Sequence, residues 1–217
     1  MTKTIGIVQV KGGAGRSTLA TNLAGELSKK GKTLLIDCDM PQGTSASWFA
    51  VRQSSPRQSE RLIADTASSH TELVDKLEQH KGVDYVVLDS PPRIAEMTRA
   101  ILILSDFCIV PVGASTAEIW ATTDILTLID EANKVKPVDA RMVWTRYRPN
   151  TKLAQELTAL AATELTIPPM HSRICMRVSY MEALGEGLTA VETGDQLAKK
   201  EVTGLVDETL AILRKRK

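Results

Sequence analysis

The chain has 217 residues, 43% of them hydrophobic and 24% charged, and its formal net charge is +1. This length suits one α/β domain with a sizeable core, which we expect to span residues 1–217. A net charge so close to zero excludes a global field that attracts nucleic acid, so any such binding must come from local patches. No apolar run reaches the ~18 residues that a membrane span needs.

The three cysteines, Cys38, Cys108 and Cys175, lie far apart and form no C-x-x-C pair. An odd count without a pairing pattern indicates a reducing compartment, so we expect a cytoplasmic protein. Met1 runs almost directly into an apolar strand. We therefore expect neither a signal peptide nor a DNA-reading domain ahead of that strand.

Strands and helices are predicted to alternate along the chain. Apolar and β-branched runs predict strands near 4–10, 33–37, 84–89, 107–112 and 140–145. Helical spacing predicts helices over 16–30, 71–80, 94–104, 116–134, 151–163, 176–184 and 196–214. This alternation predicts an α/β fold, a mostly parallel sheet with helices on both faces. The polar, turn-rich stretch 52–70 predicts a surface excursion.

A glycine-rich loop joins the first strand to the first helix and reads Lys11-Gly12-Gly13-Ala14-Gly15-Arg16-Ser17-Thr18. Its glycines let the backbone curl so that several N–H groups point at one spot. The N-terminus of the following helix adds partial positive charge there. The loop therefore predicts a binding site for nucleotide phosphates. A dinucleotide fold is disfavoured, because the third small residue of that fingerprint is missing.

Two later strands end in carboxylates. Asp37-Cys38-Asp39 follows one, ahead of Met40-Pro41-Gln42-Gly43, and Asp89-Ser90-Pro91-Pro92 follows the other. The carboxyl ends of parallel strands face the ligand crevice. Mg²⁺ prefers oxygen ligands and keeps several waters. We expect Mg²⁺ to bind Ser17 directly and Asp89 mainly through water. The alternatives are an aspartate pair that caps a turn and a buried aspartate satisfied by backbone donors.

These motifs, in this order, resemble the ParA/MinD family of P-loop ATPases, whose phosphate loop is a deviant Walker A motif. Segments 105–112, 117–121 and 181–188 resemble further family segments, so the likeness runs from about residue 4 to residue 210. The short N-terminus is similar to that of the small ParA type. Two departures stand out: Met40 is an extra residue after Asp39, and Arg16 occupies the place of the family's main phosphate-binding lysine.

The resemblance implies a function for the loop and the strand ends. In this family the early lysine, here Lys11, reaches across a dimer interface to the partner's phosphates. Lys11, Arg16 and Asp39 are therefore the expected catalytic residues of an ATPase that binds ATP or ADP with Mg²⁺ and dimerises with ATP. Residues 11–18 and Asp89 would hold the nucleotide, and Asp39 would help to place the attacking water and the Mg²⁺ shell. Three further residues lie where the family's base-contacting loops fall: Arg146, Pro168 and Met170.

Arg16 predicts impaired hydrolysis. Arginine keeps the positive charge of lysine, but it is longer and planar and favours forked contacts. We expect nucleotide to bind, because backbone N–H groups supply much of the phosphate cradle. Hydrolysis should be slow, because its transition state demands close placement of charge. An engineered change, a natural variant and a regulatory pseudo-ATPase are all compatible with this arginine.

Small ParA ATPases hold nucleoid DNA non-specifically as ATP-bound dimers. The resemblance implies a nucleoid-associated protein that positions a plasmid, chromosome or protein organelle through a ParB-like or equivalent adaptor, which stimulates hydrolysis. Basic residues are the candidates for DNA contacts: Arg146, Arg148, Lys152, Arg173, Arg177, Lys199, Lys200, Arg214 and Lys215, with Arg141, Arg216 and Lys217 in the same stretches. An ordinary solvated basic surface is the alternative interpretation.

The sequence also has features that bear on three other functions. MinD-like relatives bind membranes through a C-terminal amphipathic helix, but the apolar stripe of the last helix here lacks a bulky Phe or Trp anchor, and we expect it to pack on the sheet. An iron–sulfur role is disfavoured, because no cysteine pair has the context of a cluster ligand. A scaffold that is gated by nucleotide without turnover is the remaining alternative.

Overall fold

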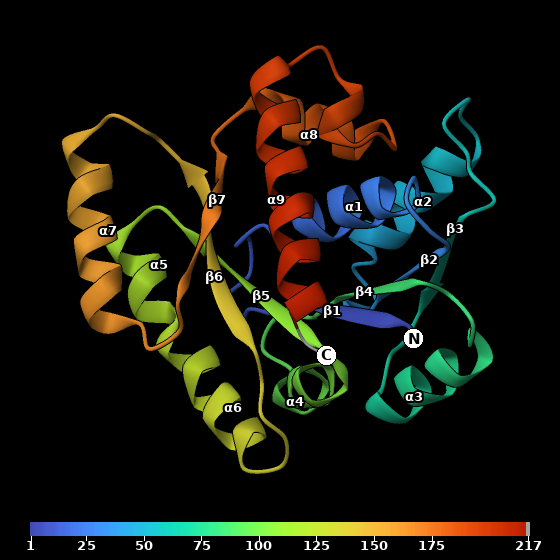
Figure 1. The fold of residues 1–217 in the computed structure, drawn as a ribbon, viewed down its shortest axis with the longest axis horizontal. Helices are drawn as coiled ribbons and strands as arrows, with labels where there is room; N and C mark the ends of the chain where they lie inside the picture. Colours follow the sequence, from blue (N-terminus) through green and yellow to red (C-terminus); the bar gives the residue numbers. More distant parts are fainter. Residues whose placement is uncertain (216–217) are drawn as a thin grey trace.

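The computed structural model describes residues 1–215 and forms a parallel sheet between two layers of helices (Figure 1). Within these residues the sheet has seven strands in the order β3-β2-β4-β1-β5-β6-β7, and every pairing is parallel. The predicted fold class is confirmed. The strands are β1 (Lys3–Ile7), β2 (Thr33–Asp37), β3 (Leu62–Thr66), β4 (Tyr85–Asp89), β5 (Phe107–Gly113), β6 (Ala140–Tyr147) and β7 (Pro169–Cys175).

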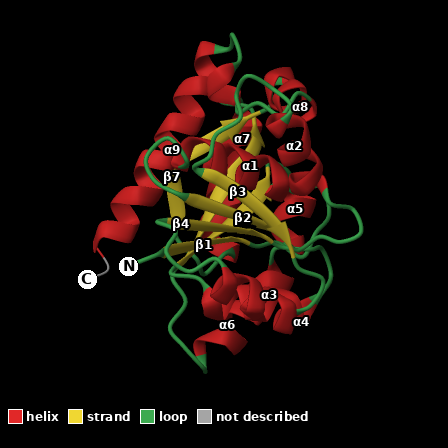
Figure 2. Cartoon of the chain, turned by 90° about the vertical axis from the view of Figure 1, so that its right-hand side faces the viewer, coloured by secondary structure: helices red, strands yellow, loops and turns green. Residues whose placement is uncertain are grey.

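Each face of the sheet buries its own apolar cluster, and Figure 2 shows the strands between the two helical layers. One face is covered by α1 (Arg16–Leu27), α2 (Thr44–Gln53), α8 (Val178–Gly185) and α9 (Gln196–Lys215). The other face is covered by α3 (His70–Gln79), α4 (Ala95–Leu104), α5 (Thr116–Ala121), α6 (Thr123–Asn133) and α7 (Lys152–Glu164). Central strands buried on both faces need continuous apolar runs, as the sequence of β4 has.

The register of the central strands brings the candidate residues to one edge of the sheet. Ile7, the last residue of β1, pairs with Asp89, and Asp37 at the end of β2 pairs with the same residue. The glycine loop leaves the sheet directly after this point. Because β1 lies between β4 and β5, the loop opens at the middle of the carboxyl edge, where ligands bind in doubly wound sheets.

Close packing requires a glycine inside β1. A Cβ atom on Gly6 would lie 2.7 Å from Ser105 Oγ and 2.8 Å from a methyl group of Ile101. Both residues belong to the segment that ends α4, so a larger residue at position 6 would push this segment off the sheet. Gly6 therefore allows the end of α4 to pack closely on β1, the strand that leads into the phosphate loop.

Several predicted elements differ from the observed ones. The stretch 52–70 holds an edge strand, β3, which short length and an internal aspartate conceal in the sequence. The edge strand β7 was also missed, as were α2 and the short 3₁₀ turn at Ala190–Glu192. The predicted helix over 116–134 is two helices that meet at Thr122, whose hydroxyl donates to the carbonyl of Glu118.

The last helix, α9, packs its apolar stripe against the sheet, as expected. Val202, Leu205 and Leu213 are among its buried residues and join the cluster beneath it. Among the helices within residues 1–215, none has the length and apolar character needed to cross a membrane.

Candidate nucleotide site

The phosphate loop runs from the end of β1 to the start of α1 and leaves the N-terminus of α1 open. Gly13 and Gly15 have left-handed backbones, with φ of 75° and 99°. Gly15 is the N-cap of α1, no side chain caps the helix, and its first turn holds no acidic residue. The first N–H groups of a helix lack partners inside it and favour an anion. The loop is thus shaped to receive a phosphate group.

Arg16 does not extend into this open loop. Its guanidinium lies against the strand ends, where Nε donates to Ser90 O at 2.8 Å and Nη1 donates to two loop carbonyls, Gln9 O at 2.8 Å and Lys11 O at 2.6 Å. The side chain is only 6% exposed. Arg16 therefore ties the phosphate loop to the end of β4, which the sequence alone did not indicate.

A weaker ion pair joins Arg16 to Asp39, with 3.8 Å between Nη2 and Oδ2. Burial lowers the pKa of Arg16, while the charges of Asp89 and Asp39 act in the opposite direction. Burial likewise raises the pKa of Asp39, against the effect of Arg16. Asp39 thus lies beside the phosphate loop, as predicted. The peptide bond between Met40, the extra residue, and Pro41 is cis.

Asp37 lies behind the Arg16–Asp39 ion pair and has a structural role. One carboxylate oxygen accepts from Asp39 N and the other from Ala46 N, both at 2.9 Å. It therefore holds the turn that leads from β2 into α2. This arrangement matches the turn-capping alternative for Asp37 and leaves Asp39 as the carboxylate that faces the loop.

Asp89 is fully buried at the end of β4. Its Oδ2 accepts from Ser45 Oγ at 2.6 Å, whereas Oδ1 has no hydrogen-bond partner among the described residues. Burial, followed by the charge of Asp37, raises the pKa of Asp89 to about 7, although hydrogen bonds from Ser45 and Ser17 and the charge of Arg16 oppose the shift. An ionised carboxylate here requires a nearby positive charge.

These residues fit a magnesium ion. The orphaned oxygen of Asp89 and the neighbouring Ser17 hydroxyl are hard oxygen ligands of the kind that Mg²⁺ takes beside its waters. Within residues 1–215 there is no group of three or more His, Cys, Asp or Glu side chains placed to hold a metal. The protein part of such a site is thus a few oxygens rather than a closed cage.

Lys11 lies at the rim of the loop and is held by a carboxylate from another helix. Its Nζ is 3.0 Å from Glu118 Oε1, and Arg146 Nη2 is 2.9 Å from the same oxygen. The side chain of Lys11 is 36% exposed and that of Glu118 is 11% exposed. Glu118 follows the N-cap Ser115 of α5, which fixes its direction. One carboxylate thus gathers two cations that the sequence assigned to ligand binding.

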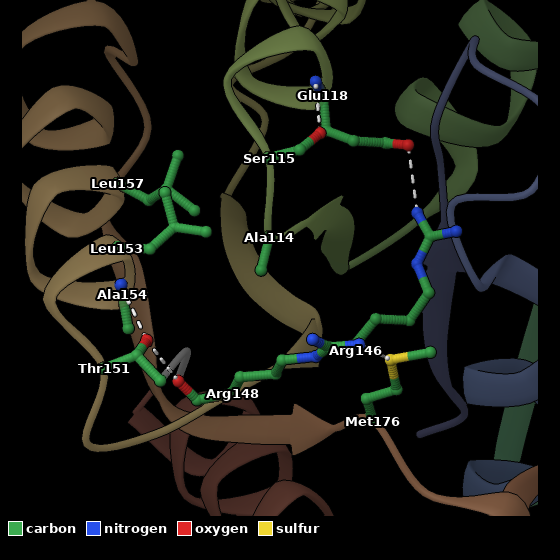
Figure 3. Close-up of a pocket in the computed structure, with 10 residues that line it drawn as sticks. All are labelled: Ala114, Ser115, Glu118, Arg146, Arg148, Thr151, Leu153, Ala154, Leu157 and Met176. Carbon is green, nitrogen blue, oxygen red and sulfur yellow. Dashed lines mark hydrogen bonds and ion pairs between the residues drawn. The ribbon is translucent and has the colours of Figure 1, made fainter.

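Figure 3 shows Glu118 and Arg146 at the wall of a cavity of about 450 Å³. Arg146 has a left-handed backbone, with φ of 52°, which turns its side chain toward α5. Below Arg146 in this view, Arg148 Nη2 lies 3.1 Å from the sulfur of Met176. Leu153 and Leu157 of α7 complete the apolar wall. This cavity shares Arg146 and Met176 with the pocket described next.

A second pocket, of about 180 Å³, borders the phosphate loop, and we call it the base-side pocket. The loop contributes Gly13 and Gly15, and α1 contributes Thr18 and Leu19. The far wall comes from the end of β6, the end of β7 and the start of α8, with the residues Thr145, Arg146, Ile174, Cys175, Met176, Arg177, Tyr180 and Met181. An apolar pocket contiguous with a phosphate site has the form that a nucleotide base requires.

Two residues expected near the base do not reach this pocket. Pro168 and Met170 lie at the amino end of β7, the opposite end from the phosphate loop, and Met170 is buried in the core. The expectation is corrected by the direction of β7: its carboxyl end supplies the lining. Recognition of β7 as a strand would have identified residues 174–177, because ligands gather at carboxyl ends.

The predicted DNA-contacting residues fall into two groups. Arg146, Arg173 and Arg177 are engaged within the protein, with Glu118, the ring and hydroxyl of Tyr147, and Glu201 respectively. The exposed Lys152 pairs with Glu156 at 3.7 Å and Arg148 contacts Met176.

The basic residues of α9 differ from these. Lys199, Lys200, Arg214 and Lys215 are exposed, and no ion pair joins them to another residue within 1–215. Arg216 and Lys217 lie outside the described residues. Among the predicted DNA-contacting residues that the structure describes, these four cations of α9 are therefore exposed and available to a partner.

Comparisons with known proteins agree with this geometry. A family model for the CobQ/CobB/MinD/ParA nucleotide-binding domain matches residues 5–190. The maintenance of carboxysome distribution protein A of Halothiobacillus neapolitanus is 26% identical over 212 residues, which cover 95% of this chain and 96% of that protein. The chromosome-partitioning ATPase Soj of Thermus thermophilus is 29% identical over 218 residues, which cover 84% and 87%.

The solved structures include a similar fold. Apo McdA of Cyanothece superposes with a TM-score of 0.80 at 19% identity, over 96% of this chain and 100% of that one. At this identity the likeness shows the fold. The fold, the phosphate loop and the matched segment thus point to the same class of domain.

Proposed function

The chain belongs to the CobQ/CobB/MinD/ParA nucleotide-binding family, and from this premise we propose that it is an ATPase that dimerises with ATP, binds DNA non-specifically and positions a cargo. The observation that carries the proposal is the open phosphate loop beside the base-side pocket. Gly13 and Gly15 belong to both, so one ligand that has phosphates and a base fills them together.

ATP is the proposed ligand. Its phosphates would accept hydrogen bonds from the N–H groups of residues 12–18 at the uncapped end of α1. Its base would lie against Met176, Tyr180 and Met181 in the base-side pocket. Mg²⁺, when bound, supplies positive charge between the phosphates. Ser17 and Asp89 would hold this ion, and Asp39 would orient a water beside it.

Lys11 is the proposed contact between two subunits. Its ammonium group stands at the rim of the loop and has one carboxylate partner, Glu118. A partially exposed ion pair of this kind is worth little, roughly 0–1 kcal/mol, so a phosphate group competes for the lysine easily. In an ATP-bound dimer each Lys11 would leave Glu118 and reach the phosphates of the other subunit.

Arg16 makes hydrolysis slow in this proposal. Four interactions hold its guanidinium against backbone carbonyls and Asp39. To place this charge on the transferring phosphate, the protein would have to give up several of them. These contacts also favour the second candidate function, a scaffold that responds to ATP occupancy without turnover.

DNA is the proposed partner of the outer face of α9. Its four exposed cations are spread over the 17 residues 199–215, and the 16 helical steps from the first to the last span about 24 Å. Binding through such contacts releases counterions and weakens steeply with salt. A dimer doubles the number of contacts, which makes the affinity depend on ATP.

The cargo is proposed from the relatives. Their names point to carboxysome distribution and chromosome partitioning. We propose that this chain positions a comparable large cargo on the nucleoid, through an adaptor protein that stimulates hydrolysis. The sequence of the adaptor, rather than that of this chain, would decide which cargo is carried.

DNA co-sedimentation tests the proposal most directly. The protein is mixed with non-specific duplex DNA in the presence of no nucleotide, ADP or ATP with Mg²⁺, each at 50 and 300 mM salt. We expect pelleting only with ATP and only at the lower salt. Equal pelleting in all three nucleotide states would contradict an ATP-controlled DNA switch. A matched assay with anionic liposomes separates the membrane-binding alternative, which predicts binding to vesicles instead.

A further inference from the structure

The outer edge of β7 is covered by the side chains of α9 rather than by another strand. Glu208 accepts from the backbone N–H groups of His171 and Ser172, both at 2.8 Å. Two turns earlier on the same helix, Glu201 accepts from Cys175 N at 3.0 Å. The two glutamates thus cap the same strand, Glu208 at its middle and Glu201 at its last residue.

Glu201 has further contacts that Glu208 lacks. Its Oε1 accepts from Arg177 Nε at 3.0 Å and Nη2 at 2.7 Å, and its Oε2 accepts from the Tyr180 hydroxyl at 2.8 Å. The side chain of Glu201 is 14% exposed. Hydrogen bonds to a charged acceptor in such a shielded place are stronger than ordinary ones. One carboxylate therefore orders the turn between β7 and α8.

The groups held by Glu201 are walls of the base-side pocket. Cys175, Arg177 and Tyr180 all line it, whereas Glu201 lies behind them and does not. A second carboxylate, Asp195, steadies the same turn from the start of α9, through Ser179 and a longer contact to Arg177. The shape of this pocket is thus set by residues far along the chain.

From these contacts we infer that Glu201 is a positioning residue for the nucleotide base: it fixes Arg177 and Tyr180 so that the base-side pocket keeps the shape that receives the base. The inference rests on the proposed nucleotide function and deepens it. Without the carboxylate, the hydroxyl of Tyr180 loses its acceptor in a buried position, and Arg177 is free to swing across the pocket mouth. Either change disturbs the base and leaves the phosphate loop intact.

The test compares Glu201→Gln with Glu208→Gln. Both variants remove one carboxylate of α9 that caps the backbone of β7, but only the first touches the pocket walls. Dissociation constants are measured by calorimetry for ATP and for inorganic tripolyphosphate, both with Mg²⁺. Tripolyphosphate has no base, so it reports on the phosphate loop alone. Thermal unfolding of each variant controls for a general loss of structure.

We expect Glu201→Gln to weaken ATP binding about tenfold, the effect of one lost charge-assisted hydrogen bond, while tripolyphosphate binding changes less than twofold. Glu208→Gln should leave the dissociation constants for ATP and tripolyphosphate unchanged. This should hold even if its melting temperature falls as much as that of Glu201→Gln. The inference is overturned if Glu201→Gln binds ATP like the wild type, or if both ligands weaken equally.

Tyr180→Phe provides a second, milder variant, because it removes only the hydroxyl that Glu201 accepts from. If Glu201→Gln does not fold, a smaller but ATP-selective loss in Tyr180→Phe supports the inference, and an unchanged ATP constant overturns it. Wild-type protein that binds tripolyphosphate but not ATP would refute the inference together with the proposed base pocket. Wild-type protein that binds neither ligand would refute the proposed function itself.

Discussion

The two sides of the candidate nucleotide site are built by different means. The phosphate side is made of backbone: a continuous loop with two left-handed glycines, tied down by the buried Arg16. The base-side pocket is made of side chains from β6, β7 and α8, and α9 holds them from behind. Substitutions on the phosphate side should therefore alter charge and chemistry, whereas substitutions behind the base-side pocket should alter fit.

Lys11→Ala is expected to have the largest effect, on the phosphate side. ATP-dependent dimerisation should be lost completely, because the proposed dimer joins each subunit to its partner's phosphates through this ammonium group. Light scattering with and without ATP measures this. Lys134→Ala, at an exposed lysine beyond α6, is the control and should dimerise normally. A persistent ATP-dependent dimer in Lys11→Ala would disprove the role across the interface.

Asp89→Asn, also on the phosphate side, tests how much the burial of an ionised carboxylate costs in folding stability. The pKa of Asp89 is about 7 in the folded protein and near 3.8 when unfolded, so folding favours the protonated form. The protonated Asp89 carboxyl therefore contributes fully to the free energy of unfolding below pH 4, and this contribution is lost as the pH rises through 7. The loss is at most on the order of 4 kcal/mol. The variant, which does not titrate, should gain stability over the wild type between pH 5 and pH 8.

Urea unfolding without Mg²⁺ at the two pH values measures this gain. The exposed Asp207, which pairs loosely with Lys30, provides the control substitution Asp207→Asn. Parallel stability curves for wild type and Asp89→Asn would show that the buried carboxyl carries no such cost.

Arg16→Lys should raise ATP turnover about 100-fold, the effect of one well-placed charge on a transition state. Lysine is shorter and cannot reproduce the fork of contacts to Gln9, Lys11 and Ser90, so its ammonium group is free to approach the phosphates. Phosphate release under saturating MgATP measures turnover, and the ATP dissociation constant should change only a few-fold. Turnover equal to that of the original chain would exclude Arg16 as the cause of slow hydrolysis.

Glu118→Gln should have the smallest effect. It releases Lys11 and Arg146 and removes one negative charge beside the loop, so tripolyphosphate should bind about two- to fivefold more tightly. Glu156→Gln breaks an ion pair of similar kind on α7, away from the loop, and should leave the affinity unchanged. Equal affinities in all three proteins would mean that the carboxylate does not restrain the two cations.

The same division explains what the sequence could and could not predict. The phosphate side is contiguous in sequence, and the strand-end rule places Asp39 and Asp89 beside it, so these residues were identified from local patterns. The base-side pocket joins segments around residues 15, 145 and 177, and Glu201 holds the last of these from behind. Its key strand, β7, begins with a proline at the sheet edge and contains three consecutive polar residues, His171, Ser172 and Arg173, so the pattern does not reveal it.

Contacts between distant side chains were the least predictable part. Glu118 meets Lys11 although the two residues are 107 positions apart in the chain. The guanidinium of Arg16 lies on backbone carbonyls that its residue type does not specify. Both arrangements follow from the register of β1, β4 and β5 and from the direction of α5. They become visible only when the fold is known.

The glutamates of α9 have one more consequence, for aggregation. An exposed edge strand offers unpaired N–H groups to any other extended chain, and such edges seed intermolecular sheets. Glu201 and Glu208 occupy three of these groups on β7 with charged acceptors. Although burial opposes it, their hydrogen bonds hold the pKa of both carboxyls below the usual range. The edge therefore stays closed in moderate acid, and the sheet is prevented from growing past its seventh strand.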